Sequence, residues 1–292
     1  MRGTLRADLA LAGAAFLFGT TFLVMQDAVA DVEPIPFIAA RFAVGALVLL
    51  PAAVVRGRGA PPRPLLLAGA SAAVALAAGY VFQTTGLQYT TSSVSAFLTY
   101  LLVVFVPLLS ALVLRRPPRS ATAVGVVLAV VGLWLLTEGA GIGLGRGEVL
   151  SILCALAFAI HILVLSEVAT RHDVVVLNAL QFGLVALALF VPGLLAGGYA
   201  FPASAWWAAV YTGVVVNALA FGLQLYGQRR VSASRTALVL MLEPVFAAIL
   251  GYVDGERIGA AGALGAGLIL GGILVSEWGQ ASLDQTVNIE GG

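Results

Sequence analysis

Residues 92–119 read SSVSAFLTYLLVVFVPLLSALVLRRPPR, and this stretch decides the fold class. From Ser92 to Leu114 no residue is charged, and a helix needs roughly 20 apolar residues to cross the hydrocarbon core of a bilayer. Three arginines and two prolines end the run at Arg115–Arg119. An uncharged run of this length that stops in a short basic turn indicates a membrane-spanning helix whose last residues face the cytoplasm.

The rest of the chain has the same character. Of its 292 residues, 61% are hydrophobic and 10% are charged, whereas a soluble domain carries about 25% charged residues. There is too little polar surface to cover a globule in water, so lipid must be the solvent. All 15 basic residues are arginines and form no dense basic patch of the kind that binds nucleic acid. The single cysteine, Cys154, excludes an intramolecular disulfide.

Ten apolar segments lie between the arginine, proline and glycine breaks. The N-terminus lacks the cleavage site of a signal peptide, so we expect the first segment to remain as a helix. The predicted spans are 8–29, 34–55, 65–86, 92–114, 119–137, 147–168, 174–196, 204–227, 232–251 and 257–277. We therefore predict an all-α membrane protein with a first five-helix repeat in residues 1–140, a second in 146–277, and a disordered cytoplasmic tail in 278–292.

The arginines set the predicted orientation, because cytoplasmic loops collect basic residues. With the N-terminus inside, only Arg146 and Arg257 fall outside, and Arg41 lies within the second span. The arginines then on the cytoplasmic side are Arg2, Arg6, Arg56, Arg58, Arg63, Arg115, Arg116, Arg119, Arg171, Arg229, Arg230 and Arg235. This bias predicts a multi-pass protein of the bacterial inner membrane with both termini in the cytoplasm.

The two halves resemble each other weakly. Residues 83–86 read QTTG and the matching residues 224–227 read QLYG, and the fifth and tenth spans share the pattern Gly-x-x-Leu-x-x-x-Gly, starting at Gly125 and Gly265. Because five is odd, equivalent loops fall on opposite sides of the membrane. The charges follow the side: Arg115 and Arg116 correspond to the acidic turn 254–256. These exchanges predict inverted repeats, as in many transporters.

Three stretches give a family resemblance. Residues 243–256 read EPVFAAILGYVDGE, residues 18–22 read FGTTF, and residues 40–42 read ARF. Together they resemble the EamA family of the drug/metabolite transporter superfamily, over residues 8–277. The resemblance implies ten helices, both termini inside, and export of small metabolites through a cavity between the halves. Within the family the chain most resembles the YddG-type exporters of aromatic and other amino acids.

Polar and aromatic side chains on the inner faces of the spans are the candidate substrate site. Polar groups are costly in a membrane helix unless they face a partner or a wet cavity, so their positions indicate the interior. The alternatives are that Ser and Thr bond their own backbone, that His161 packs structurally, and that the aromatic rings are core. The candidate substrate-binding residues are Thr20, Tyr80, Gln83, Ser95, Thr99, Tyr100, Phe158, His161, Asn217, Phe221 and Gln224.

Two prolines and two charges complete the candidates. Pro107 and Pro244 occupy equivalent spans and free the carbonyls of Val103 and Leu240, which predicts matching hinges. Arg41 and Glu243 both lie about 10 Å below the outer surface at 1.5 Å per residue. Equal depth allows a buried ion pair between them. The alternatives are that Arg41 reaches the headgroups alone or pairs with Glu33 or Glu138 at the outer boundary, and that Glu243 has a structural role beside Pro244.

The leading prediction is an exporter of amino acids and related small neutral metabolites. Sugar phosphates would need cations in the spans, where only Arg41 is available, and small multidrug exporters need an acid in the first span, where none lies between Asp8 and Asp27. No catalytic or metal-ligand pattern occurs at membrane depth, so we expect no enzyme activity, no metal and no cofactor. A non-transport subunit stays open, as do the oligomeric state, the substrate and any coupling ion.

Overall fold

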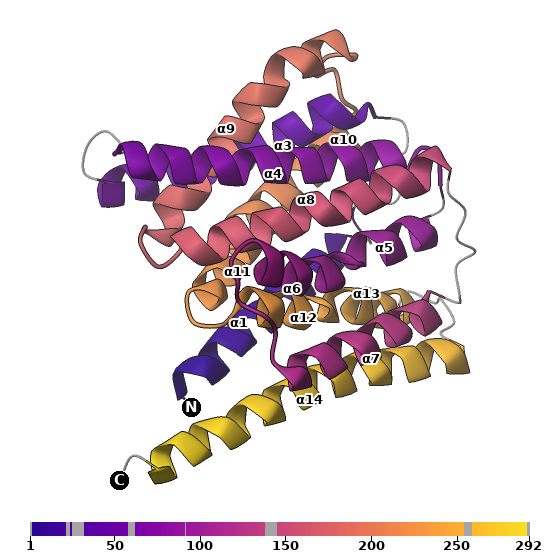
Figure 1. The fold of residues 1–292 in the computed structure, drawn as a ribbon. Coiled ribbons are helices and arrows are strands. Elements are labelled where there is room, and N and C mark those ends of the chain that lie inside the picture. The colour runs from indigo at the N-terminus through magenta and orange to yellow at the C-terminus, as the bar shows by residue number, and fades with distance from the viewer. Residues whose placement is uncertain are drawn as a thin grey trace.

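The computed structural model describes residues 2–21, 24, 32–57, 62–90, 92–137, 145–253 and 259–290, and over these residues it is helical throughout, with no strand. The helices of the first half lie side by side with those of the second in a single bundle (Figure 1). The chain is therefore an all-α protein.

The helices follow the predicted spans closely. Spans four, eight and nine are each divided into shorter helices, and spans two, three, five, six, seven and ten are single helices over their described residues. The elements are α1 (Arg2–Gly19), α3 (Pro34–Gly57), α4 (Arg63–Gly86), α5 (Ser92–Tyr100), α6 (Leu102–Leu112), α7 (Ser120–Leu136), α8 (Arg146–Val168), α9 (Val174–Leu195), α10 (Ala203–Tyr211), the π-helix η1 (Thr212–Ala220), α11 (Phe221–Gln228), α12 (Ala233–Leu240), α13 (Leu242–Val253) and α14 (Ala260–Glu290).

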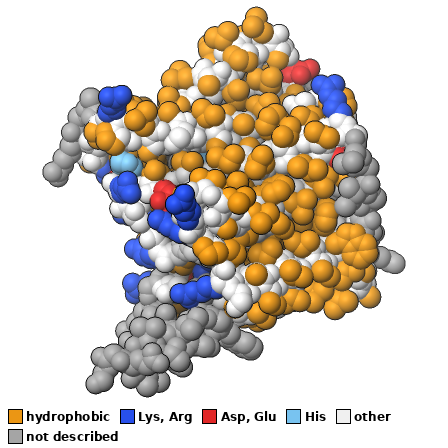
Figure 2. All heavy atoms as spheres, viewed as in Figure 1, with side chains coloured by type: hydrophobic (Ala, Val, Ile, Leu, Met, Phe, Trp, Pro, Cys, Tyr) orange, Lys and Arg blue, Asp and Glu red, His pale blue; other side chains and the backbone are white. Residues whose placement is uncertain are grey.

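Most of these helices can cross a bilayer. Seven spans in the described part of the chain are long and apolar enough, and Ser120–Leu136 and Ala260–Ser276 are shorter apolar helices. The first predicted span, 8–29, is described only as far as α1 and a few residues beyond it. Large apolar side chains such as Leu195, which is 85% exposed, cover the outside of the bundle, as they must where the solvent is lipid (Figure 2). The protein is a multi-pass membrane protein.

Helices of the two halves pair with one another. The most extensive pairings join α3 with α9, α4 with α8, and α7 with α14, while α1 packs on α11 and α13. In Figure 1, α9, α3 and α10 lie at one edge of the bundle and α7 with α14 at the other, with α1, α5, α6 and α8 between them. The interior of the protein is therefore made jointly by the two halves.

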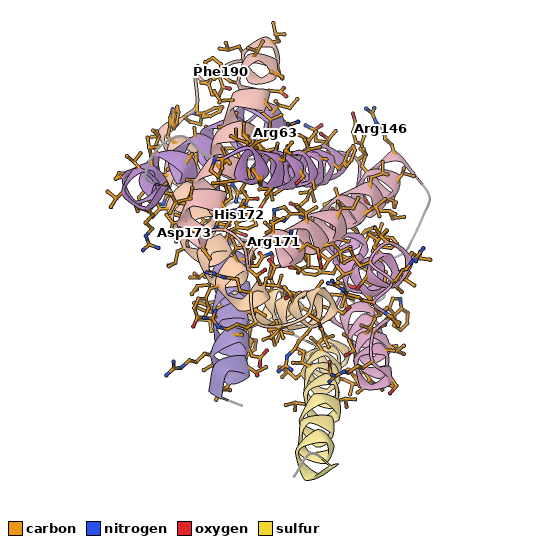
Figure 3. All side chains as sticks on the ribbon, turned by 60° about the vertical axis from the view of Figure 1, so that its left-hand side comes forward. Arg63, Arg146, Arg171, His172, Asp173 and Phe190 are labelled. Atoms are coloured by element: carbon orange, nitrogen blue, oxygen red, sulfur yellow. The ribbon has the colours of Figure 1, made fainter. Side chains whose placement is uncertain are left out.

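The start of α1 and the end of α14 lie at the same end of the bundle (Figure 1). Most of the arginines visible in Figure 2 gather there as well. Figure 3 brings this end forward and labels Arg171, His172 and Asp173 in the connection from α8 to α9; Arg146 begins α8 at its opposite end. Arg58 and the acidic turn 254–256 lie outside the described residues.

The chain beyond 277 differs from the prediction. A disordered tail is expected from residue 278, but α14 continues as a helix to Glu290. The physical reason is that the segment contains no proline, and helix geometry propagates through it once the preceding turns are formed.

Glycine allows α7 and α14 to touch along their backbones. A methyl group at Gly125 would come within 2.5 Å of the Gly272 carbonyl oxygen, and one at Gly265 would meet the Gly132 carbonyl oxygen. The Thr122 and Ser276 hydroxyls add a buried hydrogen bond of 3.1 Å between the same helices. The glycine pattern that the sequence analysis noted in these spans is thus a close helix–helix contact.

Replacing Gly265 by Ala should destabilise the protein by about 1–3 kcal/mol, because the added methyl group meets backbone that cannot move aside. Gly267→Ala is the matched control: it lies in the same helix with nothing within 4 Å of an added methyl group, so its effect should be neutral or slightly stabilising. Thermal unfolding of the purified protein in detergent checks both variants. Equal unfolding temperatures for the two would contradict the assigned contact.

Candidate functional site

Arg41 on α3 is a buried cation, with only 3% of its surface exposed. Its Nη2 donates a hydrogen bond of 3.3 Å to Oδ1 of Asn217, and the Asn217 amide nitrogen donates one of 3.0 Å back to the Arg41 carbonyl oxygen. The guanidinium carbon lies 4.8 Å from the centre of the Tyr80 ring and 5.7 Å from that of Phe42. Arg41 thus brings together side chains from α3, α4 and η1.

The backbone brings Asn217 against Arg41 by two means. Asn217 lies in the π-helix η1, a rare helix type that often marks functional positions. Glycines then allow contact between η1 and α3, since a methyl group at Gly45 would come within 2.6 Å of the Asn217 Cβ and one at Gly213 within 2.8 Å of the Arg41 carbonyl oxygen. A larger residue at either position would separate the two helices.

Glu243 does not form an ion pair with Arg41 within the described residues. The carboxyl of Glu243, in the first turn of α13, interacts instead with the hydroxyl of buried Tyr100. Tyr80 interacts electrostatically with both Arg41 and Glu243. The two charges therefore share Tyr80 as a neighbour, and the hydrogen-bond partners of the guanidinium are Asn217 and Tyr80.

Small polar groups join α5 to α8. The Ser151 hydroxyl donates a hydrogen bond of 3.0 Å to the Ser95 hydroxyl, and the Thr99 hydroxyl lies 3.8 Å from the sulfur of Cys154, which is a buried free thiol. Both contacts link the first half of the chain to the second. Ser95 and Thr99 therefore bond across the two halves and do not close on their own backbone.

Thr20 behaves in both of the ways that the sequence analysis left open. Its hydroxyl bonds its own backbone, at the Leu17 carbonyl oxygen, over 2.6 Å, and it also accepts a hydrogen bond of 2.7 Å from the Tyr211 hydroxyl. Tyr211 is the last residue of α10, so this contact too links the two halves.

A second polar cluster surrounds His161 on α8. Its Nε2 lies 2.9 Å from Oε1 of Gln181, and the Gln181 amide donates a hydrogen bond of 2.6 Å to Asn178. Sequence reasoning missed Asn178 and Gln181, although two amides three residues apart in an otherwise apolar span were a usable signal. All three side chains are buried.

The amides of α11 form a further contact between elements. The Gln224 amide donates to Gln228 over 3.3 Å, and Gln228 donates to the Ile162 carbonyl oxygen over 3.1 Å. Gln83, the repeat equivalent of Gln224, is half-buried and makes no side-chain hydrogen bond to the described residues. The two amides therefore have different surroundings although they match in the repeat.

Aromatic rings fill the space between the arginine and the histidine clusters. The Phe42 ring centre lies 5.2 Å from that of Tyr80 and 5.5 Å from that of Phe182, and Phe182 is 5.5 Å from Phe221. The series ends with Phe158 beside Tyr80 at 5.3 Å and His161 beside Phe221 at 5.9 Å. We call Phe42, Tyr80, Phe158, Phe182 and Phe221 the aromatic layer.

The helix interruptions lie close to the predicted hinges but do not coincide with them. Span four is interrupted at Leu101, six residues before Pro107, and span nine at Met241, three residues before Pro244. At both points a backbone N–H bonds the carbonyl three residues back, from Leu101 to Leu98 and from Met241 to Leu238. Both spans therefore change helix type at one point within the bundle.

The comparison with known families decides the membership of the chain. The model of the EamA-like transporter family matches residues 5–138 and again residues 145–278. The chain belongs to the EamA-like transporter family. Two successive matches also divide this EamA-like transporter into two related halves.

Relatives of this EamA-like transporter are named as transporters. One from Archaeoglobus fulgidus, an uncharacterized transporter, is 30% identical over 244 residues, covering 83% of this chain and 76% of the relative. The uncharacterized transporter YoaV of Bacillus subtilis is 24% identical over 280 residues, covering 92% of this chain and 95% of the relative. A solved crystal structure at 22% identity superposes with a TM-score of 0.80 over 92% of this chain and 96% of the other, which shows a shared fold.

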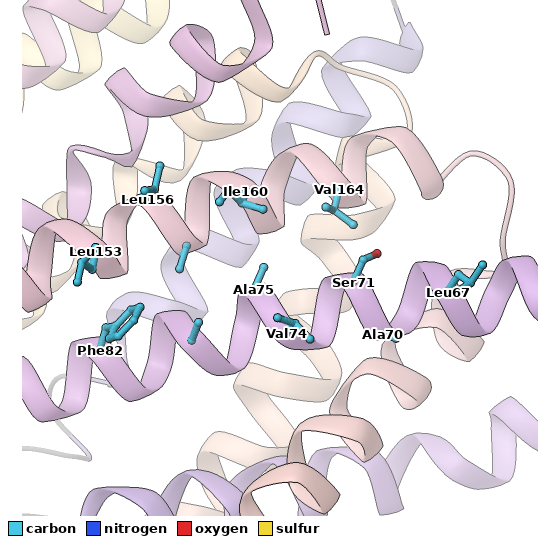
Figure 4. A pocket seen from close by; sticks show the side chains of 12 residues that line it. Leu67, Ala70, Ser71, Val74, Ala75, Phe82, Leu153, Leu156, Ile160 and Val164 are labelled. Atoms are coloured by element: carbon cyan, nitrogen blue, oxygen red, sulfur yellow. The ribbon is translucent and has the colours of Figure 1, made fainter. Parts of the chain in front are cut away.

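An apolar groove on the surface lies apart from these clusters. It has a volume of about 630 Å³ and runs between α4 and α8, where Leu67, Val74, Phe82 and Ile160 line it (Figure 4). Ser71 is the single residue with a polar side chain in its lining. A groove without groups that orient a polar molecule suits a lipid chain better than a metabolite. The polar clusters between the halves are therefore the candidate transport site.

A buried ion pair that sequence reasoning missed joins α1 to α12. Arg235 donates from Nε to Asp8 Oδ1 over 2.9 Å and from Nη2 to Asp8 Oδ2 over 2.6 Å, and the side chains are 7% and 12% exposed. The sequence analysis assigned Arg235 only to the cytoplasmic side, since residues 227 positions apart give no local signal of pairing. This two-pronged contact fixes the first helix to the second half.

Replacing Asp8 by Asn should cost about 3 kcal/mol of stability, because it removes the carboxylate charge that pairs with the buried Arg235 guanidinium. Glu167→Gln is the control. Its pair with Arg116 is largely exposed, so the loss should stay below about 1 kcal/mol. Thermal unfolding in detergent measures both variants, and an Asp8→Asn protein as stable as the wild type would contradict a stabilising role for the pair.

Proposed function

We propose that this EamA-like transporter exports amino acids and related small neutral metabolites across the bacterial inner membrane, with both termini in the cytoplasm. The observation that carries the proposal is the series of polar contacts made between the halves in the bundle interior. Arg41 with Asn217, Ser95 with Ser151, and Thr99 with Cys154 all pair a residue of the first half with one of the second. Polar groups at this depth favour a substrate path.

The helix pairing fits two halves related by a two-fold exchange, which inverted repeats require. Under this exchange α3 and α9 are counterparts, as are α7 and α14, and the two members of each pair are in contact in the bundle. The same exchange converts the contact of α4 with α8 into that of α11 with α1, which is also present. In inverted-repeat transporters the substrate site lies at the interface of the repeats, near the middle of the membrane.

The chemistry of the interior favours a small zwitterion with an apolar side chain. The aromatic layer offers apolar ring faces, while the amides of Asn217 and Gln224 and the hydroxyls of Ser95 and Thr99 offer hydrogen bonds. Few charged groups are present, so a strongly anionic substrate would not be neutralised. More specifically, we propose that the protein prefers aromatic amino acids, as YddG-type exporters do.

The interior is closely packed, so transport requires movement. Rings of the aromatic layer stack edge to face between the arginine and histidine clusters and would have to separate for a substrate to pass. The interruptions at Leu101 and Met241, each followed by a proline, are the places where spans four and nine would bend. Alternating access by rocking of the halves and facilitated passage are both compatible with this arrangement.

Counterflow in proteoliposomes tests the function. Vesicles preloaded with unlabelled Phe, Thr or Met should accumulate the labelled amino acid when they contain the protein, because exchange needs only a saturable path. Empty liposomes, and vesicles with the protein but no preloaded amino acid, are the controls. Folded protein that exchanges none of the amino acids would contradict the proposal.

The Pro107→Ala and Pro244→Ala variants extend the counterflow assay to the predicted hinges. A restored backbone hydrogen bond should stiffen each span, so exchange should slow severalfold while the protein remains folded. Pro192, within α9 and near its end, is the control position. Unchanged exchange rates in both hinge variants would argue against hinges at these spans.

A further inference from the structure

The Arg41 guanidinium has hydrogen-bonding capacity that the protein leaves unused. An arginine carries five N–H donors in a flat fork. Here Nη2 donates a hydrogen bond of 3.3 Å to Asn217, the guanidinium also bonds the Tyr80 side chain, and the buried Nε has no hydrogen-bond partner. Buried polar groups in folded proteins are nearly always satisfied, so an unpaired donor in the interior indicates a missing partner.

The charge of Arg41 is also uncompensated among the residues whose side chains the structure describes. Among the acidic residues whose side chains are described, Glu33 is exposed just before α3, and the others have partners elsewhere: Asp8 binds Arg235, Glu148 binds Thr90, Glu167 binds Arg116, Asp173 binds Arg56, and Glu243 interacts with Tyr100. What stabilises the cation is the Tyr80 side chain, through its ring face and a hydrogen bond, and the carbonyl of one amide. A buried cation within a membrane helix is expensive unless an anion joins it.

We propose that Arg41 binds the carboxylate of the transported molecule. Arginine and carboxylate form two parallel, charge-assisted hydrogen bonds, which would use the unpaired Nε together with a terminal nitrogen. Asn217 is a positioning residue, since its hydrogen bonds with Arg41 fix the direction of the fork. The inference rests on the proposed function and narrows it: the substrates are amino acids and other small organic monocarboxylates, and amines that lack the carboxylate are excluded.

The neighbours of Arg41 determine the rest of the substrate. Phe42 and Tyr80 lie against the guanidinium, and Phe182 packs on Phe42 from the second half. A carboxylate held at Arg41 therefore places the attached side chain among aromatic rings. This arrangement favours an apolar or aromatic substituent on the carboxylate.

Competition in the counterflow assay tests the inference on the wild-type protein. Unlabelled phenylpropionate, which keeps the carboxylate and lacks the amine, should inhibit exchange of labelled Phe. Phenylethylamine, which keeps the amine and lacks the carboxylate, should be weaker by about tenfold to a hundredfold, the ratio that a lost charged hydrogen bond produces. Equal inhibition by the two compounds would overturn the role of Arg41 while leaving the exporter proposal intact. Absence of exchange for every amino acid would remove both.

Variants extend the test to the residue itself. Arg41→Gln should raise the KM for Phe about tenfold or more and abolish the discrimination between the two competitors. Arg41→Lys keeps the charge but loses the two-pronged hydrogen-bonding geometry, so it should retain the discrimination between the competitors at a raised KM. If the Arg41→Gln protein does not fold, the Arg41→Lys protein provides the test. Arg146→Gln is the matched control, because Arg146 also stacks on a tyrosine ring, at 4.3 Å from Tyr89, but is exposed. Discrimination that persists unchanged in a folded Arg41→Gln protein would overturn the inference.

Discussion

The hydrocarbon of the bilayer offers no hydrogen bonds, and the rest of this structure depends on that constraint. The outside of the bundle must be apolar, so most polar side chains within a span face the interior and bond to partners there; Ser71, in the apolar surface groove, is an exception. Some partners come from the other half, as in Ser95 with Ser151, and others from an adjacent span of the same half, as in His161 with Gln181. Concentrating polar groups inside the bundle is what gives the protein a candidate site.

Close helix contacts determine where those polar groups meet. Gly45 and Gly213 let α3 and η1 approach until Asn217 reaches Arg41, while the glycines of α7 and α14 build a rigid contact at the edge of the bundle. Glycine thus has two roles in this protein: it allows the contact that positions the site, and it allows the contact that holds two helices together. Aromatic rings fill the remaining interior and separate the arginine cluster from the histidine cluster.

Much of the fold could be predicted because hydrophobicity, arginine placement and glycine spacing are local signals. The ends of α4, α7 and α8 agree with the predicted spans to within a few residues, and the glycine pattern of the fifth and tenth spans marks their contact. The partner of Arg41 was not predicted, because Glu243 at equal depth was a reasonable choice and it takes the π-helix and close glycine contacts to bring Asn217 near. Asn178 and Gln181 were overlooked although two amides in an apolar span are a signal, and the Asp8–Arg235 pair joins residues too distant in sequence to be recognised.

A transport path between the halves depends most on the two halves crossing the membrane in opposite directions, and cysteine labelling measures this directly. In a protein whose buried Cys154 is replaced by Ser, Pro62→Cys and Ala200→Cys mark the loops after the second and seventh spans, which are equivalent positions in the two halves. A membrane-impermeant maleimide added to intact cells should label Cys at 200 and should label Cys at 62 only after the membrane is opened. Labelling of both positions from the same side would contradict the inverted arrangement.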